Sequence, residues 1–537
     1  MTAMTAPRAA AGAAAVLAIA VLYAGVHWGS TVAGGADSYG YVSEAGLWRQ
    51  RHLTIQEDII RASPWPLAID TWAPLGYRAA VDRRDAIVPL YSPGLPILMA
   101  LAQSIVGFCG AFFVVPLSGA LTMWVTYHLG QRVFGDPATS LAATILTATS
   151  PVFLYQLMNP MTDVPVTAAW ALALVLTVSE RPFAAGLAAG VAMLIRPNTV
   201  PLALPLLAWS AATGERAAAT AFSRVARMAV GLAPAAIAVA AINASLYGGP
   251  LLSGYGTLGD LYSRGHVTTN VRQFVAWIAE TQTPVVALAA LYFAAPSWFP
   301  AARIRYPRAL LGATLAISAA LYLFYQPFDA WWYLRFLLPM WPVLMLLTSA
   351  ALVALARRLV PRAAVGVVLM SVGLLAAYGV RSAIARQAFD IGRAERRTID
   401  LARFVSSHTD ADAVMISLQH SGTLRLYAGR LTLRYDQLDP VWLDRAVAFL
   451  QANGRHPYVV LEGSEVEPFR QRFGSSNRVG RLDWRPFATL TSPYIAVYDA
   501  IDSPATSEPL AIGAAASKRS GWRCDLPQIW PPVLRMK

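Results

Sequence analysis

Two aspartates and two arginines in apolar surroundings are the residues of this sequence best suited to chemistry. Asp37 and Asp163 each stand in a short polar stretch beside a hydrophobic run. Arg196 is the one strongly basic residue of an apolar hairpin, and Arg335 comes shortly after a cluster of aromatic residues. A positioned carboxylate can act as a general base, and a guanidinium can hold a phosphate through two parallel hydrogen bonds. These residue types therefore predict a site that removes a proton and binds an anion.

Each of these residues also has a simpler explanation. An aspartate before a helix with proline in its first turn is an ordinary N-cap, and Asp163 precedes Val164 and Pro165. Asp37 could likewise cap a helix or flank a membrane span. Arg335 could reach the phosphates of lipid headgroups. A shared role in catalysis and anion binding is favoured only if the four residues lie on one face of a membrane.

The composition indicates a polytopic α-helical membrane protein. Of the 537 residues, 56% are hydrophobic and only 14% are charged, which is unlike an ordinary soluble chain of this length. Much of the net charge of +13 lies in short loops between apolar runs. Membrane topology explains such loops, so we expect no nucleic acid among the partners.

Arginine clusters set the predicted topology, because short basic loops stay on the cytoplasmic side. Residues 93–107 are a short apolar run that contains Pro93 and Pro96. If this run forms a helix at the outer face instead of crossing the membrane, all the arginine clusters fall on the cytoplasmic side. About eleven spans result, with the N-terminus inside and the chain after residue 385 outside. The clusters are Arg8, Arg132, Arg181, Arg216 with Arg224 and Arg227, Arg303 with Arg305 and Arg308, and Arg357 with Arg358 and Arg362.

The chain then divides into three predicted regions. Residues 1–384 form a membrane domain whose long first outer loop is 33–110, and residues 41–49 of this loop suit an amphipathic helix at the membrane interface. Residues 385–500 predict a small extracytoplasmic α/β domain, because short hydrophobic runs alternate with amphipathic stretches. Residues 501–537 predict a loosely ordered tail. The expected strands are 413–418, 458–461 and 494–498.

The two cysteines and the N-terminal apolar run say less about function than the charged residues do. Cys109 lies near the membrane and Cys524 lies in the tail, so they indicate neither a zinc site nor a disulfide framework. The apolar run 9–32 follows Arg8 as in a secretory signal. It is longer than a usual signal core and many spans follow it, so we expect an uncleaved first helix.

Several motifs occur together in one order. They are the early Asp37 of the long first loop, Tyr-Ser-Pro-Gly-Leu-Pro at 91–96, Thr-Asp-Val-Pro at 162–165, Ile-Arg-Pro at 195–197 and Arg-Phe-Leu-Leu-Pro at 335–339. In this order the sequence resembles the membrane glycosyltransferases of the GT-C fold, close to the protein O-mannosyltransferase and lipid A aminoarabinose transferase group. The resemblance covers about residues 1–385. Each motif alone is weak, and the ordered set is more specific.

The resemblance implies a multi-pass enzyme of the inner (cytoplasmic) membrane that moves a hexosyl or pentosyl group from a polyprenyl-phosphate donor to a lipid or glycan acceptor on the outer face. Asp37 and Asp163 match the family's acidic residues and are the expected catalytic residues. The donor phosphate is expected to bind Arg335, Arg196 and Arg84. The expected substrate pocket comprises Tyr39, Tyr41, Glu44, Tyr91 and Asn159.

The sequence departs from the family pattern in two places. The family often has an Asp-Glu pair in the first loop, where Ser38 follows Asp37 here. It also often has a lysine near the donor phosphate, which residues 91–93 lack, so Arg84, Arg83 or Arg335 would have to substitute. The resemblance implies no definite cofactor, leaves a divalent metal open and assigns no metal ligand. The C-terminal region is unlike the repeat domain of eukaryotic protein mannosyltransferases, so a protein acceptor is not supported.

Two other classes of function stay open as alternatives. A secondary transporter usually has inverted repeats and charges near the bilayer midplane, and the sequence shows neither. A non-catalytic membrane scaffold would present the α/β domain. Such a scaffold would have no reason to place Asp37, Asp163 and Arg335 on one face.

Overall fold

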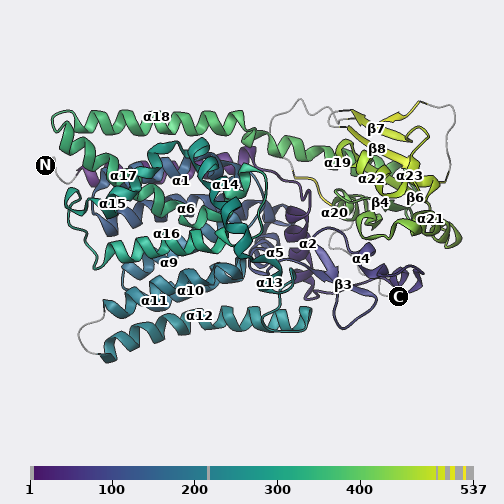
Figure 1. The fold of residues 1–537 in the computed structure, drawn as a ribbon, viewed down its shortest axis with the longest axis horizontal. Helices are drawn as coiled ribbons and strands as arrows, with labels where there is room; N and C mark the ends of the chain where they lie inside the picture. The colour runs from purple at the N-terminus through teal and green to yellow at the C-terminus, as the bar shows by residue number, and fades with distance from the viewer. Residues whose placement is uncertain (1–4, 214–217, 492–493, 502–507, 514–523, 528–537) are drawn as a thin grey trace.

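A computed structural model of the protein describes residues 5–213, 218–491, 494–501, 508–513 and 524–527. Figure 1 shows a bundle of long helices and, beyond one end of this bundle, a region of strands and shorter helices. The segment that joins helices α1 and α6 lies between these two parts.

The bundle is built from helices of apolar sequence, as expected for helices in contact with lipid. Proline is the first or second residue of α7, α8, α10, α16 and α17, where its missing N–H costs nothing. The helices are α1 (Thr5–Trp28), α6 (Val114–Val133), α7 (Pro137–Ala148), α8 (Pro151–Leu157), α9 (Asp163–Val178), α10 (Pro182–Ile195), α11 (Ala203–Ala212), α12 (Ala218–Tyr247), α14 (Val267–Gln282), α15 (Leu291–Ala294), α16 (Pro307–Leu323), α17 (Trp341–Leu359) and α18 (Ala364–Ala385).

Several helices are long enough to cross a membrane. Among the described residues, 5 helical segments are long and apolar enough to cross a membrane. The number rises to 7 if each of two bent helix pairs is counted as one span. The helical, multi-pass class predicted from the sequence is thereby confirmed, while the count of about eleven spans stays a prediction. The five segments are Arg8–Trp28, Phe108–Val133, Ala219–Tyr247, Trp331–Leu359 and Ala364–Ala385.

Helices α10 and α12 pack closely because each presents a glycine to the other. A Cβ on Gly186 would lie 2.1 Å from the carbonyl oxygen of Met228, and a Cβ on Gly231 would lie 2.3 Å from that of Phe183. Small residues allow membrane helices to approach in this way. The contact fixes the path of α10, whose last residue precedes Arg196.

The first loop contains a short sheet and the helix α2 (Asp37–Gln50). The prediction of an amphipathic interface helix over 41–49 is wrong, because every residue of α2 from Ser38 to Leu47 is buried. Helix α5 (Gly94–Val106) covers one side of α2, and the C-terminal region covers another. The predicted helix over 93–107 is present as α5, and its position at a membrane surface stays a prediction. The antiparallel sheet has the order β1-β3-β2 and comprises β1 (Ile55–Gln56), β2 (Tyr77–Ala79) and β3 (Ala86–Pro89).

The C-terminal region contains a six-stranded sheet with the order β5-β4-β6-β8-β7-β9. Strand β4 pairs in parallel with β5 and β6, and β8 pairs antiparallel with β6 and β7. The three runs predicted as strands contain or overlap β4, β6 and β8. The main elements are α19 (Ile391–His408), β4 (Val414–Ile416), β5 (Leu431–Leu433), α21 (Leu443–Ala452), β6 (Pro457–Glu462), α22 (Gly463–Phe473), β7 (Ala488–Thr491), β8 (Tyr494–Asp499) and β9 (Leu510–Ala511).

A disulfide joins Cys109 to Cys524, which corrects the expectation that the cysteines form no such bond. Cys109 belongs to the 3-10 helix Phe108–Phe113, so the bond ties the end of the chain to the membrane part. The neighbouring Asp525 forms ion pairs with Arg403 and Arg396 of α19. Most of the predicted tail lies outside the described residues, but β9 and residues 524–527 are held in the fold.

Candidate active site

The first ion pair of the site joins Asp37 to Arg335. Asp37 is the first residue of α2, and Arg335 lies in the 3-10 helix Trp331–Met340. Arg335 Nη2 donates to Asp37 Oδ2 at 3.1 Å, and the Tyr91 hydroxyl donates to Asp37 Oδ1 at 2.7 Å. Burial and the nearby Asp37 carboxylate raise the pKa of Tyr91 well above its usual value. Tyr91 therefore keeps its proton and orients the Asp37 carboxylate.

The second ion pair joins Asp163 to Arg196 at 2.6 Å. The same Arg196 nitrogen donates to Thr162 Oγ1 at 2.8 Å. The two side chains are 1% and 13% exposed, respectively, so this pair is far more buried than an ordinary surface pair. Neither Asp163 nor Asp37 acts as an N-cap. Each aspartate is the first residue of its helix, and the residue at the cap position makes no side-chain capping bond.

The two pairs form one cluster. Arg335 interacts electrostatically with both Asp163 and Asp37, and the ring of Phe336 lies 5.6 Å from the guanidinium of Arg196 and 5.3 Å from that of Arg335. Such contacts favour a cation over an aromatic face. The structure thus places the four residues on one end of the bundle, as the sequence analysis expected.

Three buried atoms of this cluster lack a hydrogen-bond partner among the described residues. They are Asp163 Oδ2, Arg196 Nη1 and Arg335 Nε. Buried polar atoms in folded proteins are nearly always paired, so each exception calls for an explanation. Two of the three are guanidinium donors, which are suited to the oxygens of an anionic ligand.

Tyrosines surround the cluster. Tyr41 lies next to Asp37, Asp163 and Thr162, and burial together with Asp37 raises its pKa above the usual value. Its ring packs on that of Tyr91 with centroids 4.6 Å apart. Tyr255 packs on the same Tyr91 ring at 6.1 Å. Phenol groups that stay protonated can donate hydrogen bonds to a ligand without adding negative charge.

An apolar groove of about 480 Å³ begins close to the cluster. Asn198 lies two residues after Arg196 and donates hydrogen bonds to Tyr262 at 3.0 Å and to Tyr322 at 3.4 Å. Tyr262 also lines the groove and interacts electrostatically with Arg196, which places the groove near the cluster. The remaining lining residues are Pro201, Ser263, Arg264, Ile317, Ala320, Leu321 and Phe324.

The structure places four of the predicted residues outside both the cluster and its surrounding tyrosines. Arg84 is exposed between β2 and β3, and in the described part of the chain it makes no ion pair with the other candidates. Tyr39 contacts Tyr77 and the C-terminal region instead, since a Cβ on Gly422 would lie 2.2 Å from its ring. The amide of Asn159 donates to the carbonyl of Tyr155.

Glu44 is the fourth of these residues. It lies two turns along α2, is 2% exposed and accepts a hydrogen bond from Trp48 Nε1 at 3.1 Å. Burial raises the pKa of Glu44 to about 8, and the bond from Trp48 offsets only part of this effect. Glu44 is therefore a buried carboxyl beneath the site and not a group that lines it.

Several residues near the cluster were not predicted from the sequence. Tyr255 lies in a loop with no regular pattern, and Phe336 was noted only as part of a motif. The C-terminal region also reaches this end of the bundle. The Tyr427 hydroxyl accepts a hydrogen bond from the backbone N–H of Ala33 at 3.0 Å, and Glu395 lies against Gly34. Such long-range contacts leave no local signal in a sequence.

The residues of the cluster suit an anion better than a metal ion. Within the ranges that the structure describes, no group of three or more His, Cys, Asp or Glu side chains could hold a metal ion. Each carboxylate of the cluster faces an arginine, which would repel a cation. The cluster residues therefore do not form a ligand set for a divalent metal ion. Their arrangement favours binding of a phosphate or another anion.

Comparison with known proteins agrees with this fold. The profile of the family described as dolichyl-phosphate-mannose-protein mannosyltransferase matches residues 90–242. The structure is similar to ArnT from Cupriavidus metallidurans bound to undecaprenyl phosphate, with 13% identity, a TM-score of 0.54 and coverage of 92% of this chain and 98% of that one. It is also similar to the oligosaccharyltransferase AglB from Archaeoglobus fulgidus in complex with an inhibitory peptide and a dolichol-phosphate, with 14% identity, a TM-score of 0.51 and coverage of 92% and 74%. No curated protein sequence matches the chain.

These likenesses establish the fold. The chain has the GT-C fold of membrane glycosyltransferases, which confirms the resemblance read from the sequence motifs. The matched family segment begins at Leu90 and contains Tyr91, Asp163 and Arg196. Thus two of the four cluster residues, together with the neighbouring Tyr91, fall within it.

Proposed function

We propose that this protein is an integral-membrane glycosyltransferase that moves a sugar from a polyprenyl-phosphate donor to a lipid or glycan acceptor. The fold supports this assignment, because proteins of similar fold have been solved with undecaprenyl phosphate and with a dolichol-phosphate. The observation that carries the proposal is the cluster itself. Two Asp–Arg pairs with unpaired guanidinium donors lie beside an apolar groove, and a lipid phosphate needs both parts.

The cluster suggests separate roles for its arginines and for Asp37. The donor phosphate binds Arg335 and Arg196, and the isoprenyl chain extends along the groove lined by Tyr262 and Leu321. A phosphate on Arg335 competes with Asp37 for the same guanidinium. Binding of the donor would therefore release the Asp37 carboxylate from its ion pair, while Tyr91 keeps it oriented.

The transfer step then follows from ordinary general-base chemistry. The acceptor hydroxyl oxygen forms a bond to C1 of the sugar, and its proton passes to Asp37. The bond between C1 and the phosphate oxygen breaks, and its electron pair stays on the phosphate. Arg335 and Arg196 stabilise the charge that develops there. The products are the glycosylated acceptor and the polyprenyl phosphate.

We further propose that the cluster and residues 385–500 face the outer side of the cytoplasmic membrane. Residues 1–384 would form the membrane domain in this arrangement. The Cys109–Cys524 bond supports it, because disulfides persist in oxidising compartments and are rare in the cytosol. A reporter that is active only in an oxidising compartment should give signal when fused after Ala385 and none when fused after Arg216. The opposite pattern would contradict the orientation.

Transfer by the purified protein in liposomes tests the function. Radiolabelled polyprenyl-phosphate sugars would be supplied with membrane lipid and glycan fractions, and label in the acceptor would be measured. Asp37→Asn should reduce the rate by about 100-fold to 10,000-fold, as loss of a positioned base does. Asp82→Asn is the matched control, because Asp82 is exposed in the same loop, and it should keep full activity.

Each failure of this experiment has a distinct meaning. Near-normal activity of Asp37→Asn would remove the catalytic assignment of Asp37. Movement of an unmodified solute across the membrane, with no transfer from any donor, would favour the secondary transporter.

A further inference from the structure

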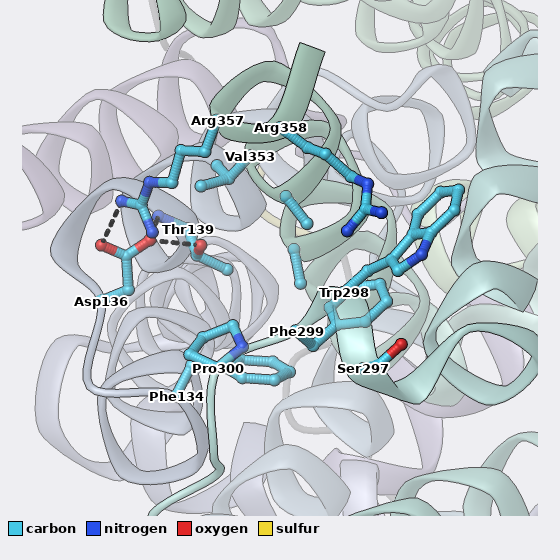
Figure 2. A pocket seen from close by; sticks show the side chains of 12 residues that line it. Phe134, Asp136, Thr139, Ser297, Trp298, Phe299, Pro300, Val353, Arg357 and Arg358 are labelled. Atoms are coloured by element: carbon cyan, nitrogen blue, oxygen red, sulfur yellow. Dashed lines mark hydrogen bonds and ion pairs between the residues drawn. The ribbon is translucent and has the colours of Figure 1, made fainter. Parts of the chain in front are cut away.

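A second cavity, of about 310 Å³, lies at the far end of α17 from Arg335 (Figure 2). Three segments form it, namely the last turns of α17, the turn between α6 and α7, and residues 297–300. Figure 2 shows Arg357 and Arg358 on one side of the cavity, with Trp298 beside Arg358 and with Phe134 and Phe299 across from the two arginines. None of these residues takes part in the candidate active site.

The cavity carries an excess of positive charge. Arg357 donates to Asp136 Oδ1 at 3.0 Å, and Asp136 also accepts hydrogen bonds from Thr139. Burial opposes ionisation of Asp136, but these hydrogen bonds outweigh it and hold its pKa below the usual range. One ionised carboxylate thus offsets one of the two lining guanidinium groups.

Arg358 supplies the remaining charge. Its guanidinium carbon lies 5.1 Å from the centre of the Trp298 ring. In the described ranges it forms no ion pair with a carboxylate. The ring favours a guanidinium orientation that leaves the N–H groups available to a second partner.

Apart from Ser297, the side chains that complete the cavity are mostly apolar. Ala350, Val353, Ala354 and Phe299 line it, and the exposed Leu359 continues α17 just beyond the two arginines. A cationic rim on an apolar wall at the end of a membrane helix matches a ligand with an anionic head and an apolar neck. Anionic phospholipids have this form, and basic pockets between membrane helices bind their headgroups.

We propose that this cavity binds the phosphate group of an anionic phospholipid, on the membrane face opposite the candidate active site. The two arginines also have a simpler role, because cations near a helix C-terminus complement its dipole and basic loops set topology. That role needs neither a cavity nor a tryptophan beside Arg358. The proposal does not depend on the glycosyltransferase assignment.

Lipid binding to the purified full-length protein tests the proposal. Delipidated protein in neutral detergent would be titrated with phosphatidylglycerol or phosphatidylcholine, and bound lipid would be counted by native mass spectrometry. We expect one phosphatidylglycerol bound in preference to phosphatidylcholine. The double variant Arg357→Ala/Arg358→Ala should weaken this binding about 10-fold or more, since each hydrogen bond to a charged group contributes on that scale.

Two further variants make the result specific. Arg224→Ala/Arg227→Ala removes the same charge from another basic cluster of the sequence and should leave phosphatidylglycerol binding unchanged. Ala354→Leu narrows the cavity, keeps both arginines and should weaken binding even if the double arginine variant does not fold. Equal binding by all variants, or equal binding of both lipids, would overturn the proposal. Displacement of the lipid by inorganic phosphate at equal concentration would overturn the assignment to a phospholipid.

Discussion

The two ends of the helix bundle both carry Asp–Arg pairs, but the pairs differ in burial. At the active-site end, the side chains of Asp163 and Arg196 are 1% and 13% exposed. At the opposite end, those of Asp136 and Arg357 are 18% and 53% exposed. A buried pair costs desolvation energy that its attraction barely repays, whereas an exposed pair has little effect on stability in either direction. The buried pair is therefore not explained by stability, and binding of an anionic ligand would give it a role.

Removing one partner of each pair should reveal this difference directly. Arg196→Ala leaves Asp163 buried and unpaired, and should cost about 3–5 kcal/mol of stability. Arg357→Ala should cost no more than about 1 kcal/mol. Thermal unfolding in detergent measures both. The double variant Asp163→Asn/Arg196→Ala should recover part of the loss, because no unpaired charge remains. Equal effects of the two single variants would show that the two pairs do not differ in their contribution to stability.

The disulfide belongs to the active-site end only. Cys524→Ser should lower stability by about 2–4 kcal/mol, because the bond closes a very long loop in the unfolded chain. Mass spectrometry of unreduced peptides should identify Cys109 linked to Cys524. Cys109→Ser and the double serine variant should behave like Cys524→Ser. Alkylation of both thiols in the native protein would contradict the bond.

Arg335 should affect use of the donor more than it affects folding. Arg335→Ala removes hydrogen bonds to a charged phosphate and should raise the donor KM about 10-fold to 100-fold. Arg335→Lys should be less impaired but should not reach the wild-type value, because a point charge does not replace the planar fork. Arg84→Ala should change little, since Arg84 lies outside the cluster. Identical behaviour of the Ala and Lys variants would argue against a bidentate contact.

Glu44 should make the active-site end sensitive to pH. Its pKa of about 8 in the folded protein lies above the ordinary value of 4.5. As pH rises from 4.5 to 8, the unfolded chain ionises while buried Glu44 stays protonated, so stability falls across this window and then levels off. Glu44→Gln should flatten the fall in the thermal unfolding midpoint between pH 5 and pH 9. An unchanged pH profile would show that Glu44 is ionised or solvated.

Much of this architecture follows from local sequence patterns. Apolar runs specify the bundle helices, and short hydrophobic runs specify β4, β6 and β8. The arginine clusters predicted that Asp37 and Asp163 lie on the same face of the membrane. In the structure both aspartates lie near Arg335 and Tyr41. This proximity could be predicted because loop charge and span length determine which loops lie on the same side.

The contacts made by the C-terminal region could not be predicted in this way. Tyr39 was expected in the substrate pocket, but Gly422 packs against its ring. Part of the burial of α2 and the Cys109–Cys524 bond also depend on chain segments hundreds of residues away. Pairings at such separations are set by the folded arrangement of whole elements, and no spacing within the sequence encodes them.

An experimental structure of the protein with a polyprenyl phosphate bound would test directly whether the cluster is the donor site. We expect the phosphate to contact both Arg335 and Arg196, the isoprenyl chain to follow the groove beside Tyr262, and the Asp37–Arg335 ion pair to be broken. A phosphate bound only in the cavity of Arg357 and Arg358, with both ion pairs of the cluster intact, would contradict the proposed donor site.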